Sequence, residues 1–246
     1  MSNTRRFIKK INSLVTFIVI LSLLLFGVYA LYSLWDNSQV YASAKNVQLK
    51  MQKLKPEIED GKASFEELLQ VNSDVKGWLS MEGTKIDYPI LQGESNLTYI
   101  NKDVYGNFAL AGSIFMDSAN KEDFSDAYNL IYGHHMANSN MFGDLDLYKN
   151  REFCQKYTKG LLMTRTKIYD LEVLATLLVP ASDNYIFEVS QNQNVSAIKA
   201  HIEANALHSQ PQLALLGENA KLLALTTCSS DFTDARTIVI AQMIER

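Results

Sequence analysis

The sequence predicts a mostly β domain with helices, closed or nearly closed into a β-barrel, behind an N-terminal transmembrane helix. From Val75 onward, apolar runs of about four to eight residues alternate with short turns, which is typical of barrels of about eight strands. Before that domain, residues 11–35 contain no charged side chain. The chain has 246 residues, 47% of them hydrophobic and 20% charged, which is enough for a sizeable core.

The N-terminal apolar run is flanked by a basic tail, residues 1–10. As a helix, residues 14–34 would span roughly 32 Å, about one bilayer core. Tyr29, Tyr32 and Trp35 stand near its far end, where an aromatic belt is expected. The basic flank predicts a cytoplasmic N-terminus and an extracellular domain. A cleaved signal peptide is the alternative, but its apolar region is usually shorter, so an uncleaved anchor at 11–35 is favoured.

The next segment, residues 36–73, is polar and has apolar residues at roughly helical spacing. Pro56 and Gly61 interrupt it, so we expect a helical stalk followed by a helix on the folded domain. Residues 74–246 are then expected to form one folded domain, which would be the catalytic domain. The net charge of -4 gives no sign of the basic face that nucleic-acid binding needs.

Seven segments of this domain have strand character, and two have helical character. The expected strand regions are 75–93, 111–117, 128–133, 160–166, 167–179, 221–227 and 236–244. The expected helices are 140–157 and 195–208, the second of which forms an insertion before the penultimate strand.

Cys228 and Arg236 carry the first indication of chemistry. Cys228 stands where one apolar strand runs out, and Arg236 opens the next strand, eight residues later. If these strands pair, the guanidinium returns close to the sulfur, where it can steady an oxyanion. Taken alone, Cys228 also fits a small buried hydrophobe, and Arg236 a surface ion pair. The other cysteine, Cys154, leaves open a disulfide with Cys228 or an inert buried thiol.

Two adjacent histidines, His134 and His135, follow the strand at 128–133 and its terminal glycine. A histidine at such a strand end can project into a cleft, although a loop histidine bonded to a backbone carbonyl is the alternative. A metal site with Cys228 is disfavoured because adjacent histidines rarely aim at one ion. His201 and His208 lie in the later helical insertion, where we expect no catalytic role.

Several of these segments together resemble one family. TTC followed by Arg after eight residues resembles the TLxTC-to-Arg signature of sortases, and IYGHHM followed by MFGDL is similar to the histidine segment of class B members. GWLSMEGTKIDYPILQG, NLTYINKDVYG and AGSIFMD also resemble class B segments, in the same order. The likeness runs from about residue 74 to residue 244. The one departure, Ala224 before the leucine of TLxTC, leaves the threonine beside Cys228 in place.

The resemblance implies a closed sortase-type barrel and a membrane-anchored cysteine transpeptidase. Such an enzyme cleaves a C-terminal sorting motif of secreted proteins through a thioacyl intermediate and joins them to a peptidoglycan amine. Cys228 would be the nucleophile, and His134, directly after the Tyr-Gly pair, the proton carrier. Arg236 would hold the oxyanion with the backbone N–H of Ser229. His135 is the alternative to His134, and no cofactor or metal is implied.

The resemblance also suggests a substrate groove. Its candidate residues are Asn96, Ile100, Tyr185, Ile186, Thr226, Thr227 and Ser229. Plain core packing is the alternative for Ile100 and Ile186.

Three other functions stay open at this point. The first is a hydrolytic cysteine peptidase with the same dyad, and the second a membrane-tethered binding module. The third is pilin polymerisation, performed by class C relatives that usually carry a lid and a second membrane helix after the barrel. This sequence ends soon after its last strand, so attachment to the cell wall is favoured.

Overall fold

The computed structural model describes residues 2–246 except residue 60, with side chains from Arg5 onward. It divides into two compact units, Met1–Ala42 and Ser43–Arg246. Helix α1, Ser2–Gln52, forms the first unit and enters the second. In the first unit its apolar side chains, such as Leu24 and Phe26, are exposed, and the helix is long and apolar enough to cross a membrane.

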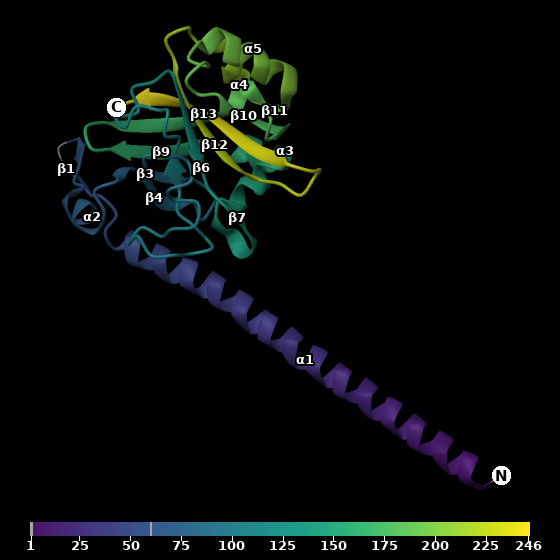
Figure 1. The fold of residues 1–246 in the computed structure, drawn as a ribbon. Helices are drawn as coiled ribbons and strands as arrows, with labels where there is room; N and C mark the ends of the chain where they lie inside the picture. The colour runs from purple at the N-terminus through teal and green to yellow at the C-terminus, as the bar shows by residue number, and fades with distance from the viewer. Residues whose placement is uncertain (1, 60) are drawn as a thin grey trace. The chain divides into compact units, whose positions relative to one another are not determined.

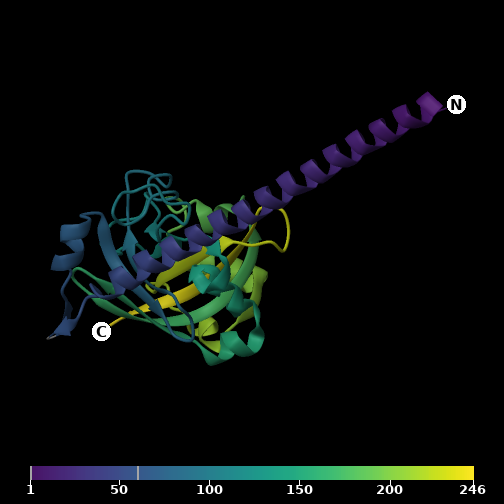
Figure 2. The same ribbon diagram turned by 90° about the horizontal axis from the view of Figure 1, so that it is seen from below.

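The second unit is built on a closed β-barrel, which confirms the predicted fold class. Its eight strands are β3 (Val75–Met81), β4 (Asp87–Leu91), β5 (Phe115–Met116), β6 (Tyr128–Tyr132), β9 (Lys159–Thr164), β10 (Ile168–Pro180), β12 (Lys221–Cys228) and β13 (Ala235–Glu245). They follow the order β10-β13-β12-β6-β5-β4-β3-β9, and β9 pairs again with β10, so the sheet closes on itself. Figures 1 and 2 show these strands curving around one interior.

The sequence missed a small hairpin before the barrel. Strands β1 (Ile58–Glu59) and β2 (Lys62–Ala63) pair with each other, and α2 (Glu66–Val71) follows. Gly61, in the turn between the two strands, has a φ of 74°, a conformation that favours glycine.

The single helix expected at 140–157 is only partly present, because the segment divides into a short strand and two shorter helices. The chain instead forms β7 (His135–Met136), the 3-10 turn η1 (Ala137–Ser139), β8 (Asn140–Met141), the 3-10 helix η2 (Gly143–Lys149) and α3 (Arg151–Lys156). A Cβ on Gly143 would lie 2.1 Å from the carbonyl oxygen of Met136, so only glycine permits this tight return. Asn150 then starts a new helix, because its side chain accepts a hydrogen bond from the backbone N–H of Phe153.

The helical insertion before the penultimate strand is present, but it is shorter than expected. It contains α4 (Asn184–Phe187) and α5 (Val195–Asn205), followed by β11 (Ala206–Ser209) and η3 (Pro211–Leu215). The residues after Asn205 leave the helix because they pair with β10 as an extra strand. Figure 1 shows α4 and α5 beside β10. Ile198 and Ile202 of α5 pack in one core cluster with the apolar residues of β10.

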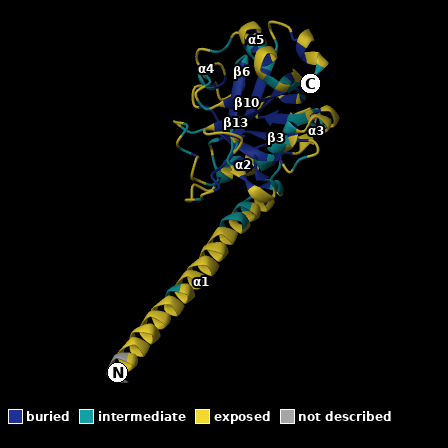
Figure 3. Ribbon diagram, turned by 90° about the vertical axis from the view of Figure 1, so that its right-hand side faces the viewer, coloured by how far each residue is buried: buried dark blue, intermediate teal, exposed yellow. Residues whose placement is uncertain are grey.

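A second core cluster attaches the end of α1 and the apolar side of α2 to the barrel. Met51 of α1 and Leu68 of α2 pack with Trp78, which is fully buried on β3. The barrel strands are the most buried part of the unit, as Figure 3 shows for β6, β10 and β13.

Asp87 connects the segment after α1 to strand β3 through charged hydrogen bonds. Its Oδ1 accepts from Lys55 Nζ at 2.7 Å, from Trp78 Nε1 at 2.8 Å and from Ser80 Oγ at 2.7 Å. Partial burial opposes ionisation of Asp87, but these bonds outweigh it and lower the pKa of the carboxyl below its ordinary value. The ionised carboxylate therefore stabilises this corner of the fold.

We expect Asp87→Asn to lower the free energy of unfolding by about 1–3 kcal/mol at pH 7, because a charged acceptor of several bonds is lost. The folded pKa lies below the unfolded one, so the contribution of Asp87 is present above about pH 4 and is lost as pH falls through the folded pKa. Urea unfolding of the full-length protein in detergent between pH 3 and pH 7 measures both effects. Glu122→Gln, which breaks an exposed ion pair with Lys76, is the control. An equal loss in both variants, or a difference between Asp87→Asn and the native protein that does not become smaller between pH 7 and pH 3, would contradict the role of Asp87.

Candidate active site

Strand β12 lies between β6 and β13 and pairs with them in opposite senses. Its pairing with β6 is parallel and ends with Thr226 opposite Tyr132. Its pairing with β13 is antiparallel and places Cys228 directly opposite Arg236. The carboxyl ends of β6 and β12 and the amino end of β13 therefore meet at one edge of the barrel. Cys228, the last residue of β12, is exposed at that edge.

His134 follows β6 at the same edge. The backbone N–H of Gly133 donates to Thr226 O at 3.1 Å, and the N–H of Phe142 donates to His134 O at 3.1 Å. His134 directly follows Gly133, so its backbone lies just beyond the end of β6, at the edge where Cys228 ends β12. A Cβ on Gly133 would lie 2.5 Å from the side chain of Ile114, so the close packing before His134 requires glycine.

One nitrogen of the His134 ring has a backbone partner. Its Nε2 lies 2.7 Å from the carbonyl oxygen of Ile100. Because a carbonyl oxygen only accepts, Nε2 carries a proton in this arrangement, and Nδ1 is the nitrogen left for proton exchange. The neighbouring His135 has its Nε2 3.0 Å from Asp146 Oδ2.

Arg236 and Ser229 direct two donors at a single oxygen. The backbone N–H of Ser229 donates to Ala235 O at 2.9 Å, and Arg236 Nη1 donates to the same oxygen at 3.0 Å. Two hydrogen-bond donors that converge on one oxygen form the arrangement that an oxyanion requires. In this structure the oxygen belongs to the chain itself.

The remaining candidate residues divide into buried and accessible groups. Thr226 and Thr227 are each 2% exposed, and among the described residues neither hydroxyl has a hydrogen-bond partner. Ile186 is fully buried in the core cluster around α5, which agrees with the packing alternative. Tyr185 is exposed and stacks on His201, with ring centroids 4.7 Å apart.

Two candidates come from the loop between β4 and β5. The side chain of Ile100 is partly exposed, and its carbonyl is the one that contacts His134. Asn96 has a partner within the fold, because its Nδ2 donates to Asp117 Oδ2 at 2.8 Å. The same oxygen of Asp117 accepts from the hydroxyl of Tyr132, the last residue of β6, at 2.8 Å. Asn96 therefore joins this loop to the strand that leads to His134.

The two cysteines are both free thiols, so the disulfide alternative is wrong. Cys154 is buried in α3, and its Sγ lies 3.6 Å from the hydroxyl of Thr176. Its environment is that of an inert packed thiol, in contrast to the exposed Cys228.

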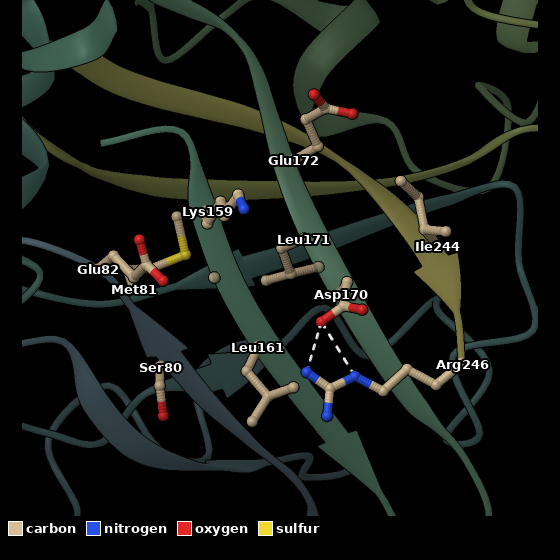
Figure 4. Close-up of a pocket in the computed structure, with 11 residues that line it drawn as sticks. Ser80, Met81, Glu82, Lys159, Leu161, Asp170, Leu171, Glu172, Ile244 and Arg246 are labelled. Atoms are coloured by element: carbon tan, nitrogen blue, oxygen red, sulfur yellow. Dashed lines mark hydrogen bonds and ion pairs between the residues drawn. The ribbon is translucent and has the colours of Figure 1, made fainter. Parts of the chain in front are cut away.

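A hollow on the domain lies at the other end of β13. Figure 4 shows Ile244 and Arg246 on its wall, with Arg246 Nη2 donating to Asp170 Oδ1 at 2.6 Å. None of the catalytic or substrate-groove candidates lines this hollow.

Comparison with known proteins decides the family. Residues 79–244 match the family model described as the sortase domain. The chain belongs to the sortase family. Sortase B of Staphylococcus aureus is 26% identical to this sortase over 243 residues, which cover 96% of this chain and 98% of that protein.

Solved structures indicate class B within the family. A class B sortase of Streptococcus pyogenes involved in pilus biogenesis is 38% identical, with a TM-score of 0.68 over 73% of this chain and 97% of that chain. A Bacillus anthracis protein similar to sortase B is 29% identical, with a TM-score of 0.70 over 86% of this chain and 97% of that chain. This chain is a class B sortase, and sortases are cysteine transpeptidases, so the activity class expected from the sequence is confirmed.

Sequence reasoning missed two polar side chains at this edge, Asp146 and Lys149 of η2. Lys149 Nζ lies 3.2 Å from Ser229 Oγ, and Asp146 accepts from the hydroxyl of Thr237. The signal in the sequence is an acidic residue three positions before a lysine, a spacing that is also common in exposed ion pairs on helices.

We expect Thr227→Val to leave the free energy of unfolding unchanged or to raise it by about 1 kcal/mol, because a buried hydroxyl without a partner is costly. If the hydroxyl serves the substrate, acylation of Cys228 slows at least about threefold, which corresponds to one lost hydrogen bond. Urea unfolding and single-turnover acylation measure the two effects. The control is Thr176→Val, which removes a buried hydroxyl that contacts Cys154 and lowers stability. Destabilisation by Thr227→Val equal to that of the control would contradict the interpretation of Thr227.

Proposed function

We propose that Cys228, His134 and Arg236 form the catalytic site of this transpeptidase. The observation that carries the proposal is the opposite pairing of β12 with its neighbours, which brings the backbones of all three to one edge. The exposure of the Cys228 thiol at that edge supports its role as the nucleophile. His134 is favoured over His135 because it directly follows Gly133, whose N–H is still bonded to Thr226 of β12, whereas His135 lies one residue further on, in β7.

The proposed reaction has two acyl-transfer steps. The thiol of Cys228 gives its proton to Nδ1 of His134, and the resulting thiolate attacks the carbonyl carbon of the scissile peptide bond, forming a tetrahedral oxyanion held by Arg236 and the N–H of Ser229. The C–N bond then breaks as the leaving amine takes a proton from the imidazolium of His134, which leaves a thioester on Cys228. An acceptor amine attacks the thioester, gives its proton to His134, and expels the thiolate as the new amide forms.

The substrate that fits this chemistry is the C-terminal sorting motif of a secreted protein, and the acceptor is a cell-wall peptidoglycan amine. A substrate groove beside Cys228 would be bordered by the loop around Ile100, with Thr226 and Thr227, which are nearly buried, forming its floor. Asn96, Tyr185 and Ile186 would contribute from its edges, with Asn96 and Ile186 acting mainly through the packing of the fold. The apolar part of α1 would anchor the enzyme in the membrane, with the basic tail in the cytoplasm and the catalytic domain outside.

A covalent trapping experiment tests the nucleophile and the orientation together. Candidate sorting-motif peptides are added outside intact cells that carry the full-length protein, and the protein is then mapped by mass spectrometry. We expect an acyl adduct on Cys228 and none on the Cys228→Ala variant, because only a thiol can form the thioester. An adduct that forms only after detergent extraction would contradict the extracellular orientation. A peptide joined to another residue would contradict the assignment of Cys228.

A second candidate function is polymerisation of pilin subunits. It is favoured by the 38% identity to the Streptococcus pyogenes class B sortase involved in pilus biogenesis. The two functions share the thioester and differ in the amine that resolves it.

Offering the preformed thioester two acceptors separates these functions. One acceptor is a peptidoglycan stem peptide with a free cross-bridge amine, and the other is a lysine-containing pilin domain. We expect the cell-wall amine to be consumed at least about tenfold faster, because the acceptor site must align one amine for attack. Release of free acid at the same rate without any acceptor would instead support the hydrolytic peptidase. Faster use of the pilin lysine would support polymerisation.

A further inference from the structure

The three proposed catalytic residues have a shared feature in their chain neighbours. The residue directly after each one carries a polar side chain: Ser229 follows Cys228, His135 follows His134, and Thr237 follows Arg236. All three of these side chains contact one pair of residues in η2, Asp146 and Lys149. The catalytic residues themselves come from three separate segments, so this pair is a common point of attachment for them.

Asp146 connects β7 and β13. Its Oδ2 lies 3.0 Å from His135 Nε2, and its Oδ1 accepts from the hydroxyl of Thr237 at 2.9 Å. The same Oδ1 lies 3.0 Å from Lys149 Nζ. Thr237 is fully buried, so its hydroxyl depends on this carboxylate as its partner.

Lys149 connects η2 to the loop between β12 and β13. Its Nζ contacts Asp231 Oδ2 at 2.6 Å and Ser229 Oγ at 3.2 Å. Partial burial opposes the charge, but the bonds to Asp231 and Asp146 outweigh it and raise the pKa of Lys149. The backbone of Lys149 is also held, because its carbonyl oxygen lies 2.7 Å from His208 Nε2 in β11.

We propose that Asp146 and Lys149 are positioning residues that set the geometry of the catalytic site, an inference that rests on the proposed roles of Cys228, His134 and Arg236. Neither residue needs to touch the substrate. Each holds the residues next in the chain to the reacting groups, and thereby fixes where the thiol, the imidazole and the guanidinium lie relative to one another.

The contacts of Asp146 and Lys149 act mainly on the relative positions of the catalytic groups. Catalytic groups must stay within about 0.5 Å of their productive positions, and residues that bind their neighbours supply that restraint. An isolated surface ion pair contributes little to stability. This pair differs because its carboxylate accepts three bonds and its ammonium makes three contacts, across four segments of the chain.

The test is steady-state kinetics of the full-length protein in detergent. The substrate is the peptide that acylates Cys228 in the trapping experiment, and hydroxylamine is the acceptor. We expect Asp146→Asn and Lys149→Met each to lower kcat at least about tenfold while KM changes less than about twofold. Lys149→Arg restores kcat to within about threefold, because it keeps the charge and donors. The double variant loses no more than the worse single variant, since the pair acts as a unit.

Lys167→Met is the matched control, because it breaks an exposed ion pair with Glu245 and is expected to keep native kcat. Changes in kcat within about twofold for both Asp146→Asn and Lys149→Met would overturn the proposal. So would a failure of Lys149→Arg to recover activity. If either main variant unfolds, Thr237→Val removes one donor to Asp146 at nearly constant shape. It is expected to lower kcat about threefold at unchanged KM, and an unchanged kcat would overturn the proposal.

Cys228→Ala separates a failure of this inference from a failure of the proposed site. Complete loss of turnover in Cys228→Ala, together with native rates for Asp146→Asn and Lys149→Met, would overturn the positioning role alone. Turnover retained by Cys228→Ala would overturn the site and the positioning role with it.

Discussion

The pairing of β12 with a parallel neighbour on one side and an antiparallel neighbour on the other is the constraint on which the site depends. If both neighbours were antiparallel, the residue after β6 would lie at the opposite edge of the barrel from Cys228. The actual arrangement brings two strand ends and one strand start together. The register is well fixed although both faces of β12 are buried, because a slip of one residue would put Leu223 and Leu225 where Leu222 and Ala224 now pack in the core cluster around α5. Apolar burial within the strand thus determines where the polar groups at its end stand.

The same strand passes from core to surface within a few residues. Ala224 and Leu225 are fully buried, Thr226 and Thr227 are nearly so, and Cys228 is exposed. The scaffold is therefore rigid up to the residue that bears the thiol, whereas the loop beyond it depends on polar contacts such as the one between Lys149 and Asp231. Rigid support on one side and a polar, adjustable loop on the other suit a site that must admit a peptide and then an amine.

The sequence predicted what is local or periodic. Cys228 and Arg236 became candidates because an apolar run, a polar loop and a second apolar run indicate adjacent antiparallel strands. The strand end made the two following histidines candidates, and only the resemblance to the sortase histidine segment favoured His134. Asp146 and Lys149 were missed because their partners, His135, Ser229 and Thr237, come from three other segments. The helix expected at 140–157 failed for a related reason: the close approach of Gly143 to the backbone of Met136 is a tertiary contact with no signature in helical periodicity.

The Ala235 carbonyl explains how the two donors can keep hydrogen-bond partners without substrate and still stabilise the transition state of the reaction. A neutral carbonyl satisfies the Ser229 N–H and Arg236 while no substrate is bound, so neither donor is left without a partner. Hydrogen bonds to an ionised acceptor are roughly twice as strong as those between neutral groups. Under the proposed mechanism, the substrate's own carbonyl competes with Ala235 on nearly equal terms, whereas its tetrahedral oxyanion competes strongly. The donors then bind the transition state better than the ground state, and that difference is what accelerates the reaction.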